Sequence, residues 1–138
     1  MISGISAGTR RACCPARFAF DHYTHIRADL FAPRGPLAGA PPPSDELRLG
    51  PALDWVEAAL PQQNGALLAG LAGSITISVD GPGSRTIRLG QGRPAAQISS
   101  DGPALIHWVT QRGSWAALGV RVTGGEAQLS IARSLHVF

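Results

Sequence analysis

The fold of this chain is decided by the stretch Ser74-Ile-Thr-Ile-Ser-Val-Asp80, the turn that follows it, and the stretch Arg85-Thr-Ile-Arg-Leu89. Apolar and polar residues alternate in the first stretch, which is the pattern of a strand with one buried face. The connection Gly81-Pro82-Gly83 is typical of a turn. The two stretches are therefore predicted to form a β-hairpin, with Ile87 and Leu89 facing the same side as the isoleucines of the first strand.

Shorter patterned segments lie on both sides of this hairpin. Two of them begin with Gly-Pro-Ala-Leu, and proline is pre-organised for the first position of a helix. Gly113 then suits the left-handed residue that ends the second of these helices. We expect helices at residues 17–32, 50–60 and 102–112, and further strands at residues 95–99 and 119–123. Residues 126–138 fit either a helix or a strand, and we prefer the helix.

Hairpins mixed with helices predict an α+β fold. We expect a small sheet of about four or five strands with helices packed on one face, preceded by a separate N-terminal helix. The predicted divisions are a disordered leader at 1–17, a helix at 18–32, a proline-rich linker at 33–46 and the α+β domain at 47–138.

The charge of the chain is concentrated at its N-terminus. The 138 residues carry twelve Arg or Lys against nine acids. Residues 1–20 hold Arg10, Arg11 and Arg17 and no acid, so the remaining residues sum to zero. A nucleic-acid-binding domain needs basic side chains massed on one surface, so we expect no nucleic-acid partner.

Two further features of the sequence bear on the cellular compartment of the protein. The longest apolar run, residues 66–79, is shorter than the ~20 residues of a membrane span, so we expect no span. Cys13 and Cys14 are the only cysteines, and adjacent cysteines rarely form a disulfide with each other. These features favour a cytoplasmic protein.

The densest group of chemically active side chains lies in the first predicted helix. Asp21, His25 and Asp29 are spaced by four residues and share one helix face. Carboxylate and imidazole groups are suitable ligands for zinc or a similar divalent ion. The alternative is a solvated helix face on which carboxylates hold the histidine by hydrogen bonds.

The three tryptophans are Trp55, Trp108 and Trp115. They are interpreted either as core and boundary packing or, together with the strand faces, as the lining of an apolar ligand pocket. His107 lies in an apolar helix and is expected at the core or its boundary. The sequence contains neither a phosphate-binding G-x-x-x-x-G-K-[ST] nor a G-x-S-x-G motif, so it names no catalytic residue.

The order of these segments resembles that of a known family. The hairpin, the stretch 95–113 with its Trp-Val-Thr-Gln-Arg-Gly exit, the stretch Leu118-Gly-Val-Arg-Val-Thr-Gly124 and a closing helix are similar to the C-terminal domain of the mycothiol-dependent maleylpyruvate isomerase family. The resemblance implies a fold like that of sterol carrier proteins over residues 64–138.

Residues 18–35 resemble the last helix of that family's metal-binding four-helix bundle. The resemblance implies that Asp21 and His25, with Asp29, belong to a divalent-metal site completed by a histidine of an earlier helix. It also implies mycothiol as a thiol cofactor. No earlier helix with that histidine is present, so residues 1–17 are interpreted as foreign to the domain, through a late start or a frame junction.

Three functions follow as hypotheses. The first is a truncated or standalone C-terminal domain that acts as a non-catalytic binding or interaction domain. The second is a metal-dependent, thiol-using isomerase or transferase completed by another chain. The third is a small carrier of lipids or other apolar ligands. We expect self-association or a helical-bundle partner through residues 18–32, since this helix would otherwise expose apolar side chains.

Overall fold

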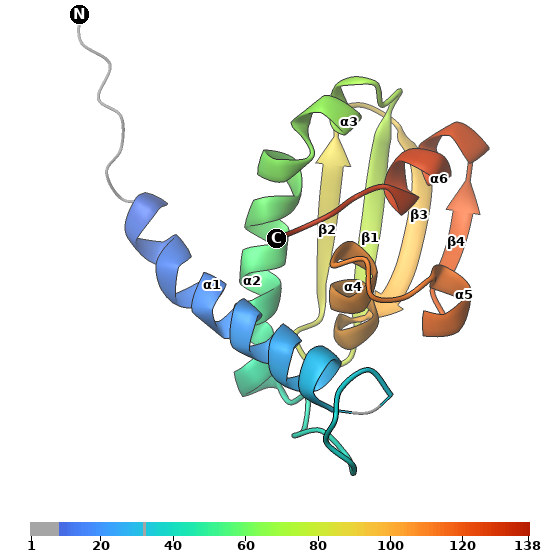
Figure 1. Ribbon diagram of the computed structural model, residues 1–138. Helices are drawn as coiled ribbons and strands as arrows, with labels where there is room; N and C mark the ends of the chain where they lie inside the picture. The colour runs from blue at the N-terminus through green and yellow to red at the C-terminus, as the bar shows by residue number, and fades with distance from the viewer. Residues whose placement is uncertain (1–8, 32) are drawn as a thin grey trace, which may run out of the picture.

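The computed structural model describes residues 9–31 and 33–138, and within this part it confirms the α+β fold (Figure 1). The helical elements are α1 (Thr9–Thr24), the π-helix η1 (His25–Leu30), α2 (Glu46–Gln63), α3 (Gly65–Ala69), α4 (Gly102–Val109), α5 (Trp115–Leu118) and α6 (Glu126–Arg133). The strands are β1 (Ser74–Asp80), β2 (Arg85–Gly90), β3 (Pro94–Asp101) and β4 (Arg121–Gly124). No described helix is long and apolar enough to cross a membrane.

The predicted hairpin forms the start of a four-stranded sheet with the order β2-β1-β3-β4. β1 pairs antiparallel with β2 and parallel with β3, and β3 pairs antiparallel with β4. Ile87, Ile77, Ile98 and Val122 consequently lie in one row across the sheet. The three isoleucines are almost fully buried, so the inward direction predicted for Ile77 and Ile87 is confirmed.

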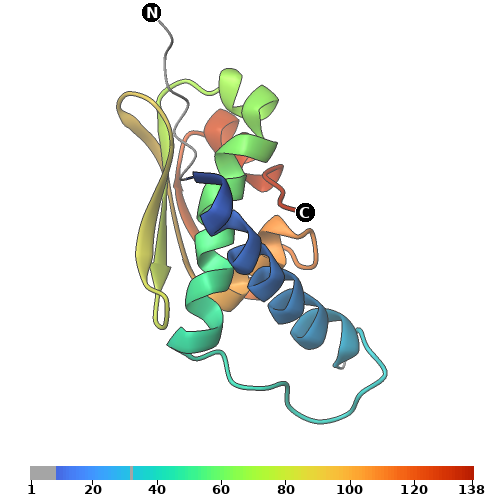
Figure 2. The ribbon, with the colours of Figure 1, turned by 90° about the vertical axis from the view of Figure 1, so that its left-hand side faces the viewer.

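Helices cover one face of this sheet (Figure 2). Leucines of α2 and apolar residues of α4 pack on the isoleucines of the strands and form the core. The opposite face carries side chains such as Thr86, Arg88 and Gln97, which are exposed. Such a polar face is typical of a sheet with one side in water.

The structure confirms the predicted start of the second proline-marked helix, whereas the first begins earlier than predicted. α4 begins at Gly102 as expected, and the Asp101 side chain accepts a hydrogen bond from the backbone N–H of Ala104 at 2.8 Å. α2 begins at Glu46, before the predicted start, and Pro51 lies inside it. The reason is the carboxylate of Asp45, which accepts from the Arg48 N–H and caps the helix one turn earlier.

The end of α4 also differs from the prediction. The left-handed residue is Gln111, with φ of 60°, and not Gly113. The backbone N–H of Arg112 donates to the His107 carbonyl at 2.8 Å, which closes the helix in a Schellman-type turn. A Cβ at position 113 would lie 3.0 Å from the Leu118 side chain. A side chain there would press on Leu118, and Gly113 does not have a left-handed φ angle.

The N-terminal helix precedes the sheet as expected, begins earlier than predicted, and packs on α2. Residues 9–17, assigned to a disordered leader, are helical, because Arg and Ala are strong helix formers and recur through them. Residues 1–8 of that leader lie outside the described residues. α1 packs along α2 through Phe20 and Tyr23, which are both buried (Figure 1).

The C-terminal residues form the helix α6 and a short extended tail. This confirms the helix that was preferred over a strand for the first part of 126–138. The tail then crosses to α2 (Figure 1), where the N–H of His136 donates to the side-chain oxygen of Asn64 at 3.0 Å.

Candidate functional site

The site is built around an ion pair between the N-terminal helical segment and the turn after α4. Nε of Arg112 donates to Oδ1 of Asp29 at 2.9 Å, and Nη2 donates to Oδ2 at 2.7 Å. Asp29 lies in η1, 83 residues away in the chain. The Schellman-type turn reverses the backbone just before Arg112, and the pair joins this turn to η1.

The charges of this pair stabilise each other. The hydrogen bonds from the Arg112 guanidinium, with a smaller contribution from His25, hold the pKa of the Asp29 carboxyl well below its usual range. The same hydrogen bond to Asp29 raises the pKa of Arg112. Asp29 is therefore a carboxylate, and Arg112 a cation, at every pH at which the domain would be studied.

The three residues predicted to bind a metal contact other side chains in this structure. Nδ1 of His25 lies 2.7 Å from Oδ2 of Asp29, as the solvated-face alternative describes. Both oxygens of Asp29 are engaged by Arg112, while Asp21 faces Arg17 at 3.9 Å. Among the described residues, no three His, Cys, Asp or Glu side chains form a cluster that could hold a metal ion. This arrangement does not fit a metal centre, and no metal-dependent step follows from it.

A cavity of about 380 Å³, which we call the arginine cleft, lies on one side of the ion pair. Its walls come from α1, η1, the connection between η1 and α2, α4, and the turn after α4. The side chains that characterise it are three arginines, two aromatic rings and one histidine: Arg27, Arg34, Arg112, Tyr23, Phe31 and His107. No Asp or Glu is among the described residues that line the cleft.

Arg27 is held in the cleft by an aromatic ring. Its guanidinium carbon lies 4.1 Å from the centroid of the Tyr23 ring, and Nη2 donates to the carbonyl of Pro43 at 2.8 Å. Its Nε is buried and has no hydrogen-bond partner. Burial raises the pKa of the Tyr23 phenol, whose oxygen lies 2.6 Å from Oγ of Ser44. Tyr23 therefore stays neutral beside the arginine.

His107 lines the cleft with a ring that is held through Nδ1. Nδ1 lies 2.8 Å from the carbonyl of Pro103. A carbonyl only accepts, so Nδ1 carries the proton and Nε2 of the neutral ring is an acceptor. His107 is half-buried at the boundary, which agrees with its expected place.

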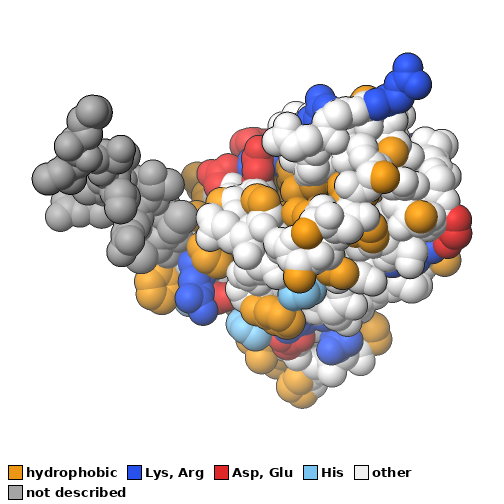
Figure 3. Space-filling view, turned by 90° about the horizontal axis from the view of Figure 1, so that it is seen from above, with side chains coloured by type: hydrophobic (Ala, Val, Ile, Leu, Met, Phe, Trp, Pro, Cys, Tyr) orange, Lys and Arg blue, Asp and Glu red, His pale blue; other side chains and the backbone are white. Residues whose placement is uncertain are grey.

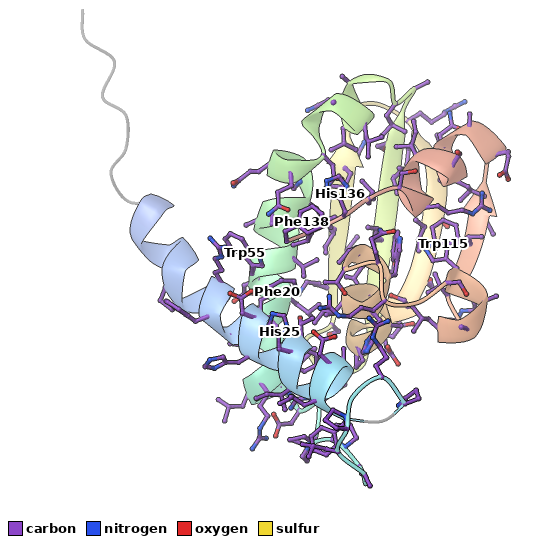
Figure 4. All side chains as sticks on the ribbon, in the orientation of Figure 1. Phe20, His25, Trp55, Trp115, His136 and Phe138 are labelled. Carbon is purple, nitrogen blue, oxygen red and sulfur yellow. The ribbon has the colours of Figure 1, made fainter. Side chains whose placement is uncertain are left out.

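A second cavity of about 380 Å³ is also lined by Arg112. Arg112 therefore contributes to both cavities. The second cavity also meets Asp21, His25 and Thr24, and the buried hydroxyl of Thr24 has no hydrogen-bond partner. Phe20 and His25, which Figure 4 shows on the N-terminal helical segment, both line this second cavity.

The predicted tryptophan pocket is only partly assembled. Trp108 and Trp115 meet edge to face with ring centroids 5.2 Å apart, beside a cavity of about 450 Å³. Arg133 stacks on Trp115 at 4.9 Å. Trp55 lies on α2, next to α1 and away from α5 (Figure 4), with Arg17 over its ring at 5.8 Å. Trp108 is buried in the core, so packing accounts for it.

Sequence reasoning missed the arginines of the cleft. Arg27, Arg34 and Arg112 occur singly in the chain, and no spacing rule connects them. The one sequence signal was the Gln-Arg-Gly exit of the second predicted helix, which served only to support the family resemblance. No protein-family model and no curated protein sequence matches the chain.

Proposed function

We propose that this chain is a non-catalytic binding domain, organised like the C-terminal domain of the mycothiol-dependent maleylpyruvate isomerase family, and that its arginine cleft binds a small organic carboxylate. The observation that carries this proposal is the composition of the cleft: three arginines line it, and no acid lies among its described lining residues. Asp29 is paired with Arg112 and hydrogen-bonded to His25, and these contacts support binding over metal-dependent catalysis.

The charge of the cleft favours an anion. The carboxylate of Asp29 balances the charge of Arg112, to which it is hydrogen-bonded. Arg34 lies farther from this carboxylate, with Nε 3.9 Å from Oδ1. Arg27 is paired with no carboxylate among the described residues, and its buried Nε lacks an acceptor. Guanidinium groups match the planar geometry of a carboxylate and can bind it through two parallel hydrogen bonds.

The remaining walls of the cleft favour a flat apolar group on the ligand. Phe31, the Tyr23 ring and prolines of the connection supply these walls. A volume of about 380 Å³ is at the lower end of the range for small-molecule sites. An aromatic carboxylate would therefore satisfy both the charge and the apolar lining.

Isothermal titration with three probes tests this proposal. We expect benzoate to bind with a Kd on the order of 1 mM, and acetate and benzamide to bind at least about tenfold more weakly, because each lacks one of the two features. Arg27→Gln should weaken benzoate binding by about tenfold. Arg88→Gln, on the exposed face of the sheet, is the matched control and should leave it unchanged. Equal binding of benzamide, or an unchanged affinity in Arg27→Gln, would contradict the proposal.

We also propose that the domain associates with a second copy of itself through the outer side of α1. Phe18 on α1 and Leu47 at the start of α2 are 67% and 81% exposed. Between these helices lies a shallow, mainly apolar cavity of about 280 Å³, lined by residues that include Ala19, Ile26 and Leu47. On the face seen in Figure 3, hydrophobic atoms are instead scattered among polar and backbone atoms.

Sedimentation velocity over a range of protein concentrations measures this association. The wild type should shift from monomer to dimer as concentration rises, and Phe18→Ser combined with Leu47→Ser should remain a monomer, because the shared apolar surface is lost. Phe138→Ser removes an equally exposed ring (73%) elsewhere and should still dimerise. A wild type that stays monomeric throughout would refute self-association without affecting the carboxylate proposal.

A further inference from the structure

We propose that Asp29 is an internal competitor for the ligand carboxylate, so that a carboxylate binding to Arg112 displaces Asp29 and releases η1 from the turn after α4. This inference rests on the proposed binding of carboxylates in the arginine cleft. Asp29 then sets the ligand affinity of the arginine cleft and links ligand binding to the position of η1.

The geometry of the ion pair is the geometry that a bound ligand would adopt. Two nitrogens of Arg112 hold two oxygens of one carboxylate at 2.9 Å and 2.7 Å. Arg34 approaches the same carboxylate from a second direction, with Nε 3.9 Å from Oδ1. Both arginines also line the cleft. A ligand carboxylate that reaches them must therefore share or replace Asp29.

Asp29 can leave Arg112 without becoming a buried, unpaired charge. Its side chain is 31% exposed, so water can solvate the displaced carboxylate. His25, one helical turn earlier, keeps Nδ1 at 2.7 Å from Oδ2 and offers a remaining hydrogen bond. When a ligand carboxylate replaces that of Asp29, Arg112 still has one carboxylate partner. Its partly buried guanidinium is therefore never left unpaired.

The element that carries Asp29 is suited to move. Residues 25–30 form a π-helix, a rare conformation that is found mainly as short segments and frequently at functional sites. Within it, Ala28 is the only fully buried residue, whereas α1 is anchored independently through Phe20 and Tyr23. Release of Asp29 would therefore loosen η1 while α1 stays packed on α2.

Asp29 could instead hold Arg112 in position for the ligand, and the two roles predict opposite effects of its removal. If Asp29 competes, neutralising it frees the guanidinium and strengthens ligand binding. If Asp29 positions Arg112, neutralising it disorders the guanidinium and weakens binding. Asp29→Asn separates the two roles because asparagine preserves the shape of the side chain and removes its charge.

The test is benzoate titration of full-length wild type, Asp29→Asn and Asp21→Asn. We expect Asp29→Asn to bind benzoate about five- to tenfold more tightly than the wild type, since a charged competitor is replaced by a neutral one. Asp21→Asn is the matched control on the same helical segment. Its carboxylate faces Arg17 and is not among the side chains that line the arginine cleft, so this variant should bind benzoate with the affinity of the wild type.

Hydrogen exchange of the wild type gives a second measurement that needs no variant. Saturating benzoate should accelerate exchange of the amides of residues 26–31 and leave those of α2 unchanged. Unchanged or weaker benzoate binding in Asp29→Asn, or slower exchange in residues 26–31 on saturation, would overturn the inference. If benzoate binds and Arg27→Gln weakens it, these results leave the proposed function standing. If benzoate does not bind to any of these proteins, the proposed function fails and this inference fails with it.

Discussion

Replacing Asn64 with alanine is expected to lower the free energy of unfolding by about 3 kcal/mol, because it removes three hydrogen bonds of a buried side chain and takes from both backbone groups of His136 the partner they have in Asn64. Asn64 is 1% exposed and lies between α2 and α3. Its Nδ2 donates to the carbonyls of Leu60 and His136 at 2.8 Å and 2.7 Å, and its Oδ1 accepts from the His136 N–H at 3.0 Å. This one side chain thus fastens the C-terminal tail to the end of α2.

Chemical denaturation of Asn64→Ala measures this effect, and the neighbouring residue provides a matched control. Gln63 makes the same pair of contacts with Phe138, through Nε2 and Oε1, but at the surface. Water can replace those hydrogen bonds, so Gln63→Ala should change stability by less than about 1 kcal/mol. Equal losses in the two variants would show that burial does not set the strength of the Asn64 contacts.

Gly124→Ala is expected to be at least as destabilising, by about 3 kcal/mol, because the added methyl group meets backbone atoms. Gly124 ends β4 with φ of 141°, a conformation that residues with a side chain rarely adopt. A Cβ there would lie 2.6 Å from both the Ala95 carbonyl oxygen and the Cα of Ala96. These atoms belong to β3, the partner strand, so they cannot move without disturbing the sheet.

Gly119→Ala separates the strain of the backbone from the steric clash. Gly119 has φ of 67°, and a Cβ added there would meet no atom within 4 Å beyond those of its chain neighbours. Alanine should therefore cost only about 1 kcal/mol there, from the left-handed conformation alone. Thermal or chemical unfolding of the two variants gives the comparison, and a Gly124→Ala loss as small as that of Gly119→Ala would contradict the predicted clash.

The secondary structure was largely predictable because its signals are local. The alternation in residues 74–79 and 85–89 specifies strands with one buried face, and the short turn between them favours a hairpin. Where prediction failed, a single side chain changed the outcome. Asp45 moved the start of α2 to Glu46, and Gln111 took the left-handed position that had been predicted for a glycine two residues later.

The candidate site was predictable only in its N-terminal half. Asp21, His25 and Asp29 share a helix face because they are four residues apart, and the contact between His25 and Asp29 follows from that spacing. The same spacing suggested a metal site, and it could not indicate that Asp29 is already engaged. The partner that engages it is 83 residues away and has no periodic relation to it.

The sequence by itself therefore determined the elements, the α+β class and the face that each strand buries, since these depend on periodicity and on neighbouring residues. Only the tertiary structure decided what those elements bring together: Asn64 with the C-terminal tail, Tyr23 with Ser44, and Arg112 with Asp29. The physical reason is that the partner of a charge or a hydrogen-bonding group is chosen by packing. Packing joins residues by their distance in space, whatever their separation in the chain.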